Sequence, residues 1–303
     1  NVQLPNKRKW DFVDRKWQLK ILEDPSRKMV VKKGAQEGFT TVFLAKVLHA
    51  ANYTPITVMY TLPRRDDLSD FVNLTLNPII KASPHISSLI HDTDSVRVKR
   101  FRAEVQDEHG DTEIIESTLQ LMEASVEPRM IPVDYLVNDE IDRVEDQDFL
   151  NMFLARLDNS PDPHHFQFST PTVPGYGIDK LYDNTTQNEW MVKCLYCSEE
   201  QMLNWDKNYA DNPPRYICSG CHETLNADVI ISGKWVALYP DNDTVGYHIS
   251  HMMMPISRPV AGLAKELSDS RITTKNFYNL RLGLPYSSAT GSFTKEMFYQ
   301  RCF

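Results

Sequence analysis

The first part of the chain alternates between short apolar runs and amphipathic stretches. Continuous apolar runs at 28–32 and 56–60 predict buried strands, and stretches with apolar residues at helical spacing lie at 10–23 and 39–51. A further helix is expected after the second strand, beginning with a turn and running up to Pro78. This order of strand, helix, strand and helix predicts a parallel sheet with crossover helices.

The rest of the pattern extends this sheet and then departs from it. Apolar runs at 133–139 and 165–169 predict two more strands, whereas the acidic, poorly patterned segment 103–118 predicts an exposed hairpin or an insertion. Residues 190–222 are rich in cysteines, turns and aromatic residues. Two β-rich stretches, WVALY and VGYHIS, and a mainly helical region, 257–282, follow.

The composition is that of a soluble globular protein. The 303 residues are 41% hydrophobic and 24% charged, and the absence of an 18-residue apolar run predicts no membrane span. The start, NVQLPNKRKW, lacks a signal-peptide core, and because its first residue is not Met we expect a trimmed chain. The net charge of −8 argues against a surface coated in nucleic acid. Basic clusters at 7–9, 64–65 and 97–102 fit local contacts or solvated faces equally well.

The segment KKGAQEGFTT, residues 32–41, has most of what a phosphate-binding loop needs, namely a preceding strand, two glycines and two hydroxyls. In the usual pattern, G-x-x-x-x-G-K-[ST], a lysine follows the last glycine, but Phe39 stands there and should pack under the following helix. A lysine at the front of the loop can reach the same phosphates. Lys33 directly precedes Gly34, whereas strand alternation sends Lys32 to the opposite side. We therefore favour Lys33 for this role over a reading of both lysines as solvated strand-end residues.

Four of the five cysteines form two C-x-x-C pairs separated by 20 residues: Cys194, Cys197, Cys218 and Cys221. This is the spacing of a four-thiolate zinc site, in which each pair places two sulfurs on one ion. Two disulfides or buried free thiols are the alternatives. A site with four protein thiolates is closed, so the zinc would be structural. The clustering is unlike a secreted disulfide scaffold and favours a reducing cytoplasm.

Polar residues end two of the predicted strands. The stretch VDYLVNDEID, 133–142, ends in Asp139 and Glu140, and in P-loop ATPases such a strand-end acid holds Mg²⁺ while the next glutamate orients the attacking water. The following strand ends in Ser169 and Thr170. In open α/β sheets ligands bind outside the carboxyl ends of the strands, so these hydroxyls should lie at the same edge. Each feature is weak alone and gains weight from the upstream glycine loop.

In their order, these segments resemble the large terminase subunit of tailed phages, specifically its lambda-like branch. The resemblance covers nearly the whole chain, through the helix with Trp17-Gln18, KKGAQEGFTT, VMYTLPRRDDLSDF, NPIIKASPHI, YLVNDEID, FSTPTVPGYGIDKLY, GYHISHMMMP and FYNLRLGLPY. It implies an α/β fold, namely a RecA-like P-loop ATPase with a mostly parallel sheet flanked by helices and a small zinc-ribbon insertion. It further implies an ATP-driven motor that moves double-stranded DNA into a procapsid.

The same resemblance implies partners and a division of the chain. The partners are double-stranded DNA, the small terminase subunit and the portal protein, on which the family forms a homo-oligomeric ring. The place of action is the host cytoplasm, with no role in a membrane or in the mature virion. The expected parts are an ATPase core at 1–188, the ribbon at 189–224, closing strands and helices at 225–286, and the start of a linker at 287–303. We do not assign the family's nuclease to these residues, because SSATGSFTKEMFYQRCF cannot hold that domain.

Roles carried over from the family follow its motifs. Gln18 matches the adenine-contacting glutamine, Glu140 the catalytic glutamate, and Ser169 and Thr170 the coupling motif. Thr40 and Asp139 match the Mg²⁺ site, and Lys33 takes the phosphate-contacting and catalytic role of the displaced lysine. An arginine acting in trans is expected in a ring ATPase, with Arg143 and Arg156 as candidates. The cofactors implied are ATP, Mg²⁺ and structural Zn²⁺. The residues expected to bind the nucleotide are Gln18, Lys33, Gly34, Ala35, Gln36, Glu37, Gly38, Phe39, Thr40 and Thr41.

Two other functions fit parts of the pattern. A non-hydrolysing zinc-ribbon DNA-binding or scaffold protein with a decayed loop would explain Phe39. A helicase of the same superclass usually has two RecA-like lobes, and only one is predicted here. The intact pair Asp139 and Glu140 favours the packaging ATPase, because a decayed enzyme need not retain both acids.

Overall fold

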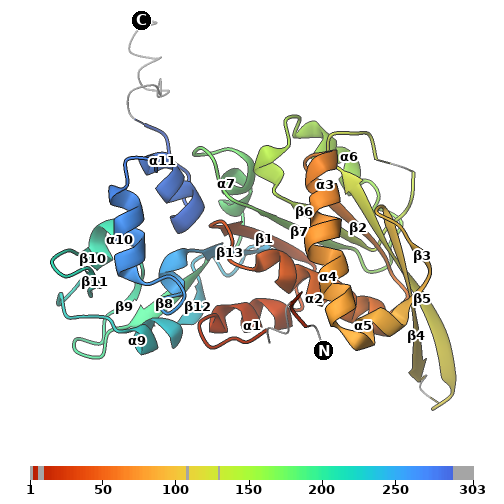
Figure 1. Cartoon of the computed structure of the whole chain (residues 1–303), viewed down its shortest axis with the longest axis horizontal. Coiled ribbons are helices and arrows are strands. Elements are labelled where there is room, and N and C mark those ends of the chain that lie inside the picture. Colours follow the sequence, from red (N-terminus) through yellow and green to blue (C-terminus); the bar gives the residue numbers. More distant parts are fainter. Residues whose placement is uncertain (1–2, 6–9, 107–108, 129, 289–303) are drawn as a thin grey trace, which may run out of the picture.

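A computed structural model describes residues 3–5, 10–106, 109–128 and 130–288, which are built around one large sheet with helices on both faces (Figure 1). The strands of this sheet are β1 (Lys28–Lys33), β2 (Thr57–Leu62), β3 (Ile90–Asp94), β4 (Val98–Gln106), β5 (Thr112–Glu123), β6 (Tyr135–Asp139), β7 (His164–Ser169), β8 (Asn188–Lys193), β9 (Glu200–Met202), β12 (Lys234–Ala237) and β13 (Val245–Ile249). Their order is β12-β8-β13-β1-β7-β6-β2-β5-β4-β3, with β9 beside β8. The neighbours from β8 to β5 in this order pair in parallel, and the strands outside them pair antiparallel. The predicted mostly parallel α/β fold is confirmed.

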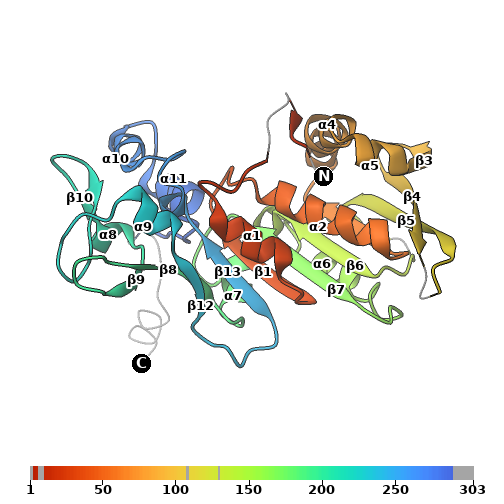
Figure 2. The ribbon, with the colours of Figure 1, turned by 90° about the horizontal axis from the view of Figure 1, so that it is seen from below.

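Two groups of helices cover the two faces of the sheet (Figure 2). One face carries α1 (Lys16–Glu23), α2 (Phe39–Tyr53), α3 (Arg65–Phe71), α4 (Asn77–Ala82) and α5 (Pro84–Leu89). The other carries α6 (Asp148–Leu154) and α7 (Gly177–Tyr182). Smaller elements follow: α8 (Trp205–Asn208), α9 (Ala227–Ile231), α10 (Val260–Ser268), α11 (Thr274–Phe277), the 3-10 turns η3 (Ile141–Arg143) and η4 (His251–Met253), and the π-helical turn η5 (Tyr278–Leu282). No helix among the described residues is long and apolar enough to cross a membrane.

The central strands are apolar on both sides because both faces are covered. In β1, Met29 and Val31 pack against the α1–α5 face, while Val30 faces α6 and α7. In β2, Tyr60 packs on the α1–α5 face and Met59 on the face of α6 and α7. The continuous apolar runs in the sequence therefore report burial on two faces, as the prediction of buried strands required.

Two of the predicted helices differ from the structure in extent. The first helix begins at Lys16 and not at residue 10, and the Asp14 carboxylate just before it accepts hydrogen bonds from the N–H groups of Ile256 and Ser257. The prediction that the third helix ends at Pro78 is wrong. A π-helical turn, η2 (Val72–Leu76), precedes α4, and Pro78 occupies its first turn, where proline is tolerated.

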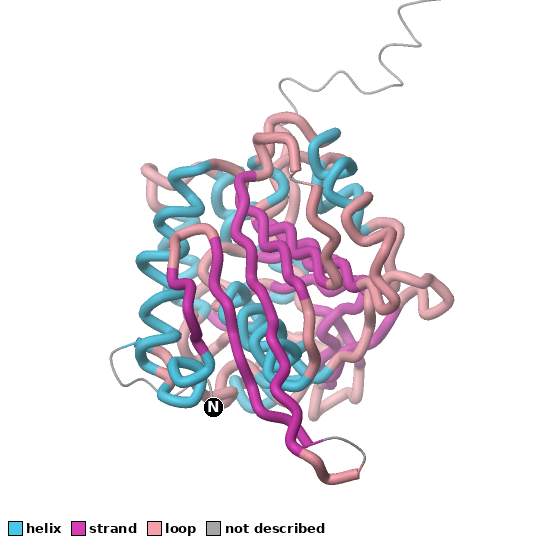
Figure 3. Tube along the Cα trace, turned by 90° about the vertical axis from the view of Figure 1, so that its right-hand side faces the viewer, coloured by secondary structure: helices cyan, strands magenta, loops and turns pink. Residues whose placement is uncertain are grey.

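The segment at 103–118 forms the predicted hairpin, but this hairpin is also part of the main sheet. Figure 3 shows β4 and β5 as its longest strands, projecting past the sheet at their far end. β5 pairs in parallel with β2, and alternate residues, including Phe101 and Leu119, enter the core. The alternation of apolar and polar residues is broken in β5, where Ile114 is exposed and Ser117 is buried, and this is why the sequence pattern is weak.

The cysteine-rich region packs against the helices that close the chain. Trp205 in α8 stacks on Tyr209 and meets the ring of Phe277 in α11 edge-on, with centroids 5.0 Å apart in the second pair. The Tyr278 hydroxyl donates to Asp206 at 2.9 Å. A two-stranded ribbon, β10 (Tyr209–Ala210) and β11 (Arg215–Tyr216), completes this region. The division of the chain at 188, 224 and 286 stays a prediction; residues 289–303 lie outside the described residues, as do the basic residues 7–9.

Candidate functional site

The glycine loop lies between β1 and α2, at the carboxyl edge of the sheet. Gly38 has a φ of +76°, a conformation that favours glycine, and it directly precedes α2. A Cβ on Gly34 would lie 2.6 Å from Glu37 Oε1 and 3.0 Å from the carbonyl oxygen of Leu280, so a larger residue there would displace its neighbours. The local geometry of the loop therefore favours glycine at both positions.

Distant parts of the chain hold the loop in place. Gln18 Nε2 donates to the carbonyl of Glu37 at 2.9 Å, and the N–H of Ala35 donates to the carbonyl of Leu280 at 2.8 Å. His251 Nε2 lies 2.7 Å from the carbonyl of Ala35; because a carbonyl only accepts, this nitrogen carries the proton. The loop is thus fixed from α1, η4 and η5 in addition to its own strand and helix.

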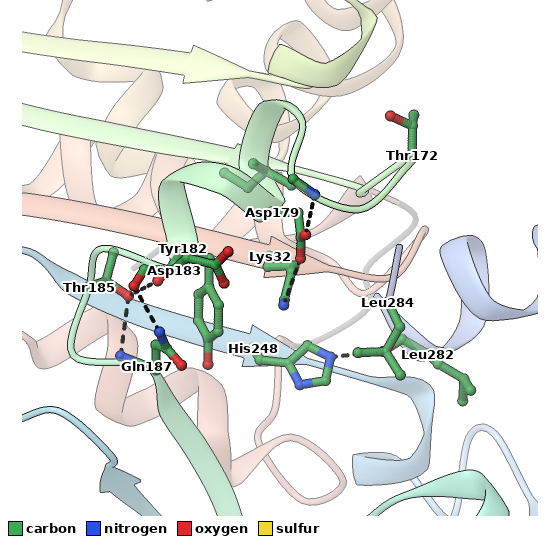
Figure 4. Close-up of polar contacts among 12 residues, drawn as sticks. Lys32, Thr172, Asp179, Tyr182, Asp183, Thr185, Gln187, His248, Leu282 and Leu284 are labelled. Atoms are coloured by element: carbon green, nitrogen blue, oxygen red, sulfur yellow. Dashed lines mark hydrogen bonds and ion pairs between the residues drawn. The ribbon is translucent and has the colours of Figure 1, made fainter. Parts of the chain in front are cut away.

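The two lysines at the front of the loop point to opposite sides of β1. Lys33 Nζ lies 2.7 Å from Glu140 Oε1. Lys32 Nζ lies 3.1 Å from Asp179 Oδ1 and 4.3 Å from the ring centre of Tyr182 (Figure 4). The predicted alternation is confirmed, and only Lys33 faces the acids of β6. Phe39 is buried against Phe43 and Phe168, which confirms its expected packing.

The two acids at the end of β6 have different surroundings. Asp139 Oδ2 accepts hydrogen bonds from the Tyr60 hydroxyl at 2.7 Å and the Thr40 hydroxyl at 3.4 Å. Glu140 has a φ of +54°. In addition to the contact with Lys33, its Oε2 accepts a hydrogen bond from the N–H of Thr170 at 3.4 Å. The left-handed backbone turns the second carboxylate away from the strand and toward the glycine loop.

These surroundings shift the pKa values of Asp139, Glu140 and Lys33 in different directions. Burial, and then the charge of the neighbouring Glu140, raise the pKa of Asp139 to about 7. Burial also opposes the charge on Glu140, but Lys33 outweighs it, so the pKa of Glu140 lies below its usual value. Burial would lower the pKa of Lys33, but Glu140 and Asp139 together raise it. At neutral pH, Lys33 and Glu140 form a charged pair.

The strand-end hydroxyls join the acids to a longer hydrogen-bonded path. The Ser169 hydroxyl lies 3.5 Å from Glu140 Oε2 and accepts from the N–H of Asp142. Asp142 Oδ2 accepts from both the N–H and the hydroxyl of Thr172, each at 3.0 Å. The carbonyl of Thr172 in turn accepts from Asn279 Nδ2 at 2.9 Å. The loop after β7 is therefore held between the acidic strand end and η5.

The two candidate arginines differ in position. Arg143 follows the acids directly; its side chain is half exposed, and Nη2 lies 2.9 Å from Asp67 Oδ1. The carbonyl of Arg156 accepts from the N–H of Val133, which lies before β6, at the opposite end of the strand from the acids. Only Arg143 is near the edge of the sheet that carries the site. Whether either acts in trans stays a prediction.

The four cysteines come together on two turns. Their sulfur atoms all lie within 4.8 Å of one another, with 3.7 Å between those of Cys194 and Cys221 and 3.5 Å between those of Cys197 and Cys218. Four thiolates around a zinc ion at about 2.3 Å each stand at this spacing, so the residues fit the ion. All four are free thiols, which excludes the alternative of two disulfides in this structure. His222 is exposed and is not part of the cluster.

The sequence reasoning missed several residues of the site. Tyr60, Asp142 and His251 each contact a residue that it assigned, and Asn279 contacts Thr172 in the loop after β7. Asp142 is the third acid of YLVNDEID and carried the clearest signal. The others lie in the middle of a strand or in late helical turns, where neither type nor spacing marks them.

The mostly parallel sheet covered by helices defines a RecA-like α/β domain. The chain belongs to the family described as phage terminase large subunit gpA, ATPase domain, whose model matches residues 20–235. No curated protein sequence matches the chain. The lambda-like branch stays a prediction.

Two solved structures, given first below, show the same fold, and the chain is also similar to a third. The Thermus phage P74-26 large terminase ATPase domain superposes with a TM-score of 0.55 and 11% identity, covering 88% of this chain and 92% of that chain. An arginine-to-alanine variant of that domain gives a TM-score of 0.55 and 11% identity over 89% and 93%. The HK97 bacteriophage large terminase gives a TM-score of 0.42 and 14% identity over 58% of this chain and 36% of that chain.

Proposed function

We propose that this chain hydrolyses ATP to move double-stranded DNA during viral genome packaging. Membership of the terminase ATPase family supports the class of function. The observation that carries the proposal is the meeting of Lys33 with Glu140, beside Asp139 and Thr40, at the carboxyl ends of β1 and β6. A loop that had lost its function would not be expected to keep an ammonium paired with a strand-end carboxylate.

The residues have separate roles in this proposal. The backbone N–H groups of the loop and Lys33 bind the phosphates, and Gln18 holds the loop and contacts the adenine. Asp139 and Thr40 would hold Mg²⁺, and the ion would supply positive charge against the phosphates. Glu140 orients the attacking water, and the charge of Lys33 keeps it deprotonated. Ser169 and Thr170, in contact with Glu140, transmit the nucleotide state.

Further parts of the proposal concern partners. A zinc ion on Cys194, Cys197, Cys218 and Cys221 stabilises the ribbon. An arginine from a neighbouring subunit, Arg143 or Arg156, completes each site in a homo-oligomeric ring on the portal protein. The small terminase subunit helps to select the viral DNA, and the place of action is the host cytoplasm.

The test is steady-state ATP hydrolysis with and without duplex DNA. Glu140→Gln keeps the size of the side chain but removes the carboxylate, and it should abolish hydrolysis while nucleotide binding persists. Glu145→Gln is a matched control, because Glu145 is exposed and contacts Arg64. Unchanged hydrolysis in Glu140→Gln would sink the assignment. Absence of hydrolysis in the parent protein, in any oligomeric state, would favour the non-hydrolysing ribbon protein.

A further inference from the structure

Tyr60 lies in the middle of β2, and neither the sequence pattern nor the family roles assign it a function. Its side chain is fully buried, with the hydroxyl 2.7 Å from Asp139 Oδ2. A carboxylate oxygen accepts in this contact, so the Tyr60 hydroxyl is the donor. A phenol is therefore fixed as a neutral donor to one oxygen of the proposed metal ligand.

The ring of Tyr60 has little freedom to move. It stacks on Phe71 of α3 with centroids 4.8 Å apart and planes 11° apart. Phe168 of β7 meets it edge-on at 6.5 Å. Because the ring is held on two sides by rings from different elements, the position of the hydroxyl is set by the core and not by solvent.

The two oxygens of Asp139 are unequal as a result. Oδ2 receives the hydroxyls of Tyr60 and Thr40, whereas Oδ1 is buried and has no hydrogen-bond partner among the described residues. An unpartnered buried carboxylate oxygen is costly, and a cation is the group that satisfies it best. The hydroxyl of Tyr60 thus sets which oxygen of Asp139 is left for a ligand.

Tyr60 also matters because its hydroxyl donates to Asp139 without adding a positive charge. Asp139 and Glu140 are adjacent, and the ammonium of Lys33 makes its hydrogen bond to Glu140. The direct donors to Asp139 are both neutral, so they favour the charged carboxylate without placing a positive charge where a cation would sit. Such outer contacts orient metal ligands, and their loss typically weakens metal binding by about 10- to 100-fold.

We propose that Tyr60 is the positioning residue of the Mg²⁺ site, holding Asp139 so that Oδ1 is presented to the ion. This inference rests on the proposed function, because it requires Asp139 to be a metal ligand.

The test compares Tyr60→Phe with Tyr182→Phe, using the full chain and Mn²⁺ as the probe. Tyr182 is a matched control, since its buried hydroxyl donates to another carboxylate, Glu189, at 3.0 Å, away from the acids. Mn²⁺ is titrated against each variant with a non-hydrolysable ATP analogue, and bound Mn²⁺ is followed by electron paramagnetic resonance. Tyr60→Phe should raise the half-saturating Mn²⁺ concentration about tenfold. Tyr182→Phe should match the parent.

Partial unfolding does not blur this result, because it lowers the amount of bound Mn²⁺ but not the midpoint of the folded molecules. An unchanged midpoint in Tyr60→Phe overturns the inference. A third variant, Asp139→Asn, distinguishes failure of the role of Tyr60 from failure of the proposed function. If Asp139→Asn binds Mn²⁺ like the parent, the metal role of Asp139 is wrong. If it loses Mn²⁺ while Tyr60→Phe does not, only the role of Tyr60 is wrong.

Discussion

Lys32 and Lys33 are neighbours in β1, but strand alternation places their ammonium groups on different sides of the sheet. Replacing each of them should therefore have a different effect. Lys33 reaches the acid pair, and Lys32 reaches Asp179 on the far side. Lys33→Ala should lose most ATP hydrolysis, about 10²-fold or roughly 3 kcal/mol, because it removes the ammonium that contacts the transferred phosphoryl group. Lys32→Ala should keep its activity per folded molecule but unfold at lower denaturant, because it leaves the carboxylate of Asp179 buried without its partner.

The two lysine variants control each other when hydrolysis and urea unfolding are both measured. Hydrolysis at the parent rate in Lys33→Ala would show that the displaced-lysine interpretation is wrong. The loop would then depend on its backbone, its metal and an arginine from a neighbouring subunit.

A histidine at the start of β7 gives the stability a pH dependence. Burial lowers the pKa of His165 to about 4 from an ordinary value near 6.5, and its Nε2 lies 2.8 Å from Asn138 Oδ1. Between these values the unfolded chain binds the proton and the folded chain does not. The free energy of unfolding should therefore fall as the pH drops from about 6.5 toward 4, by at most about 1.4 kcal/mol per pH unit from this residue.

This prediction is checked by urea unfolding at several pH values. His165→Gln should flatten the pH dependence in this window, and His85→Gln, at an exposed position of α5, should not. An identical slope in His165→Gln and the parent would contradict the assignment. His251, whose pKa burial also lowers to about 4, should supply part of the remaining slope.

At the scale of elements, the ribbon should depend on its metal. Cys218→Ser should reduce bound zinc from about one ion per chain and lower the thermal stability more than the rate of hydrolysis, because a structural zinc contributes folding energy directly. His222→Ala is the matched control, since His222 lies next to the cluster without joining it. Elemental analysis of protein purified without added metal is the measurement. Zinc-free parent protein that is stably folded would refute the site.

The sequence predicted the strands and the acids well because both depend on local signals. Apolar runs mark strands buried on two faces, and adjacent carboxylates after β6 mark the edge of the sheet. It failed where the cause is not local. Pro78 does not end its helix because it follows a π-helical turn and stands in the first turn of α4. The β5 strand is hard to recognise because Ile114 is exposed and Ser117 is buried, which breaks the alternation. His251 and Asn279 contact the site through folding of distant segments, for which a single sequence holds no signal.

At the scale of the whole molecule, the net charge of −8 constrains DNA binding. Affinity has to come from a localised basic surface, so it should fall steeply with salt as counterions are released. A motor has to move along any sequence, so its contacts should be to phosphates and binding should be similar for unrelated duplexes. Fluorescence anisotropy with two duplexes of equal length over a salt series tests this. A strong preference for one sequence in this chain alone would count against a translocating motor.

The loop between β1 and α2 is synthesised well before several of the segments that support it. The carbonyl of Leu280 holds Ala35, and a Cβ on Gly283 would lie 2.9 Å from the N–H nitrogen of Gly34. β13, at 245–249, pairs with β1 directly beneath the loop. A ribosome has therefore released nearly the whole described chain before the loop has its final shape. A nascent chain therefore cannot give this loop its final shape until the segments up to Gly283 have also been made.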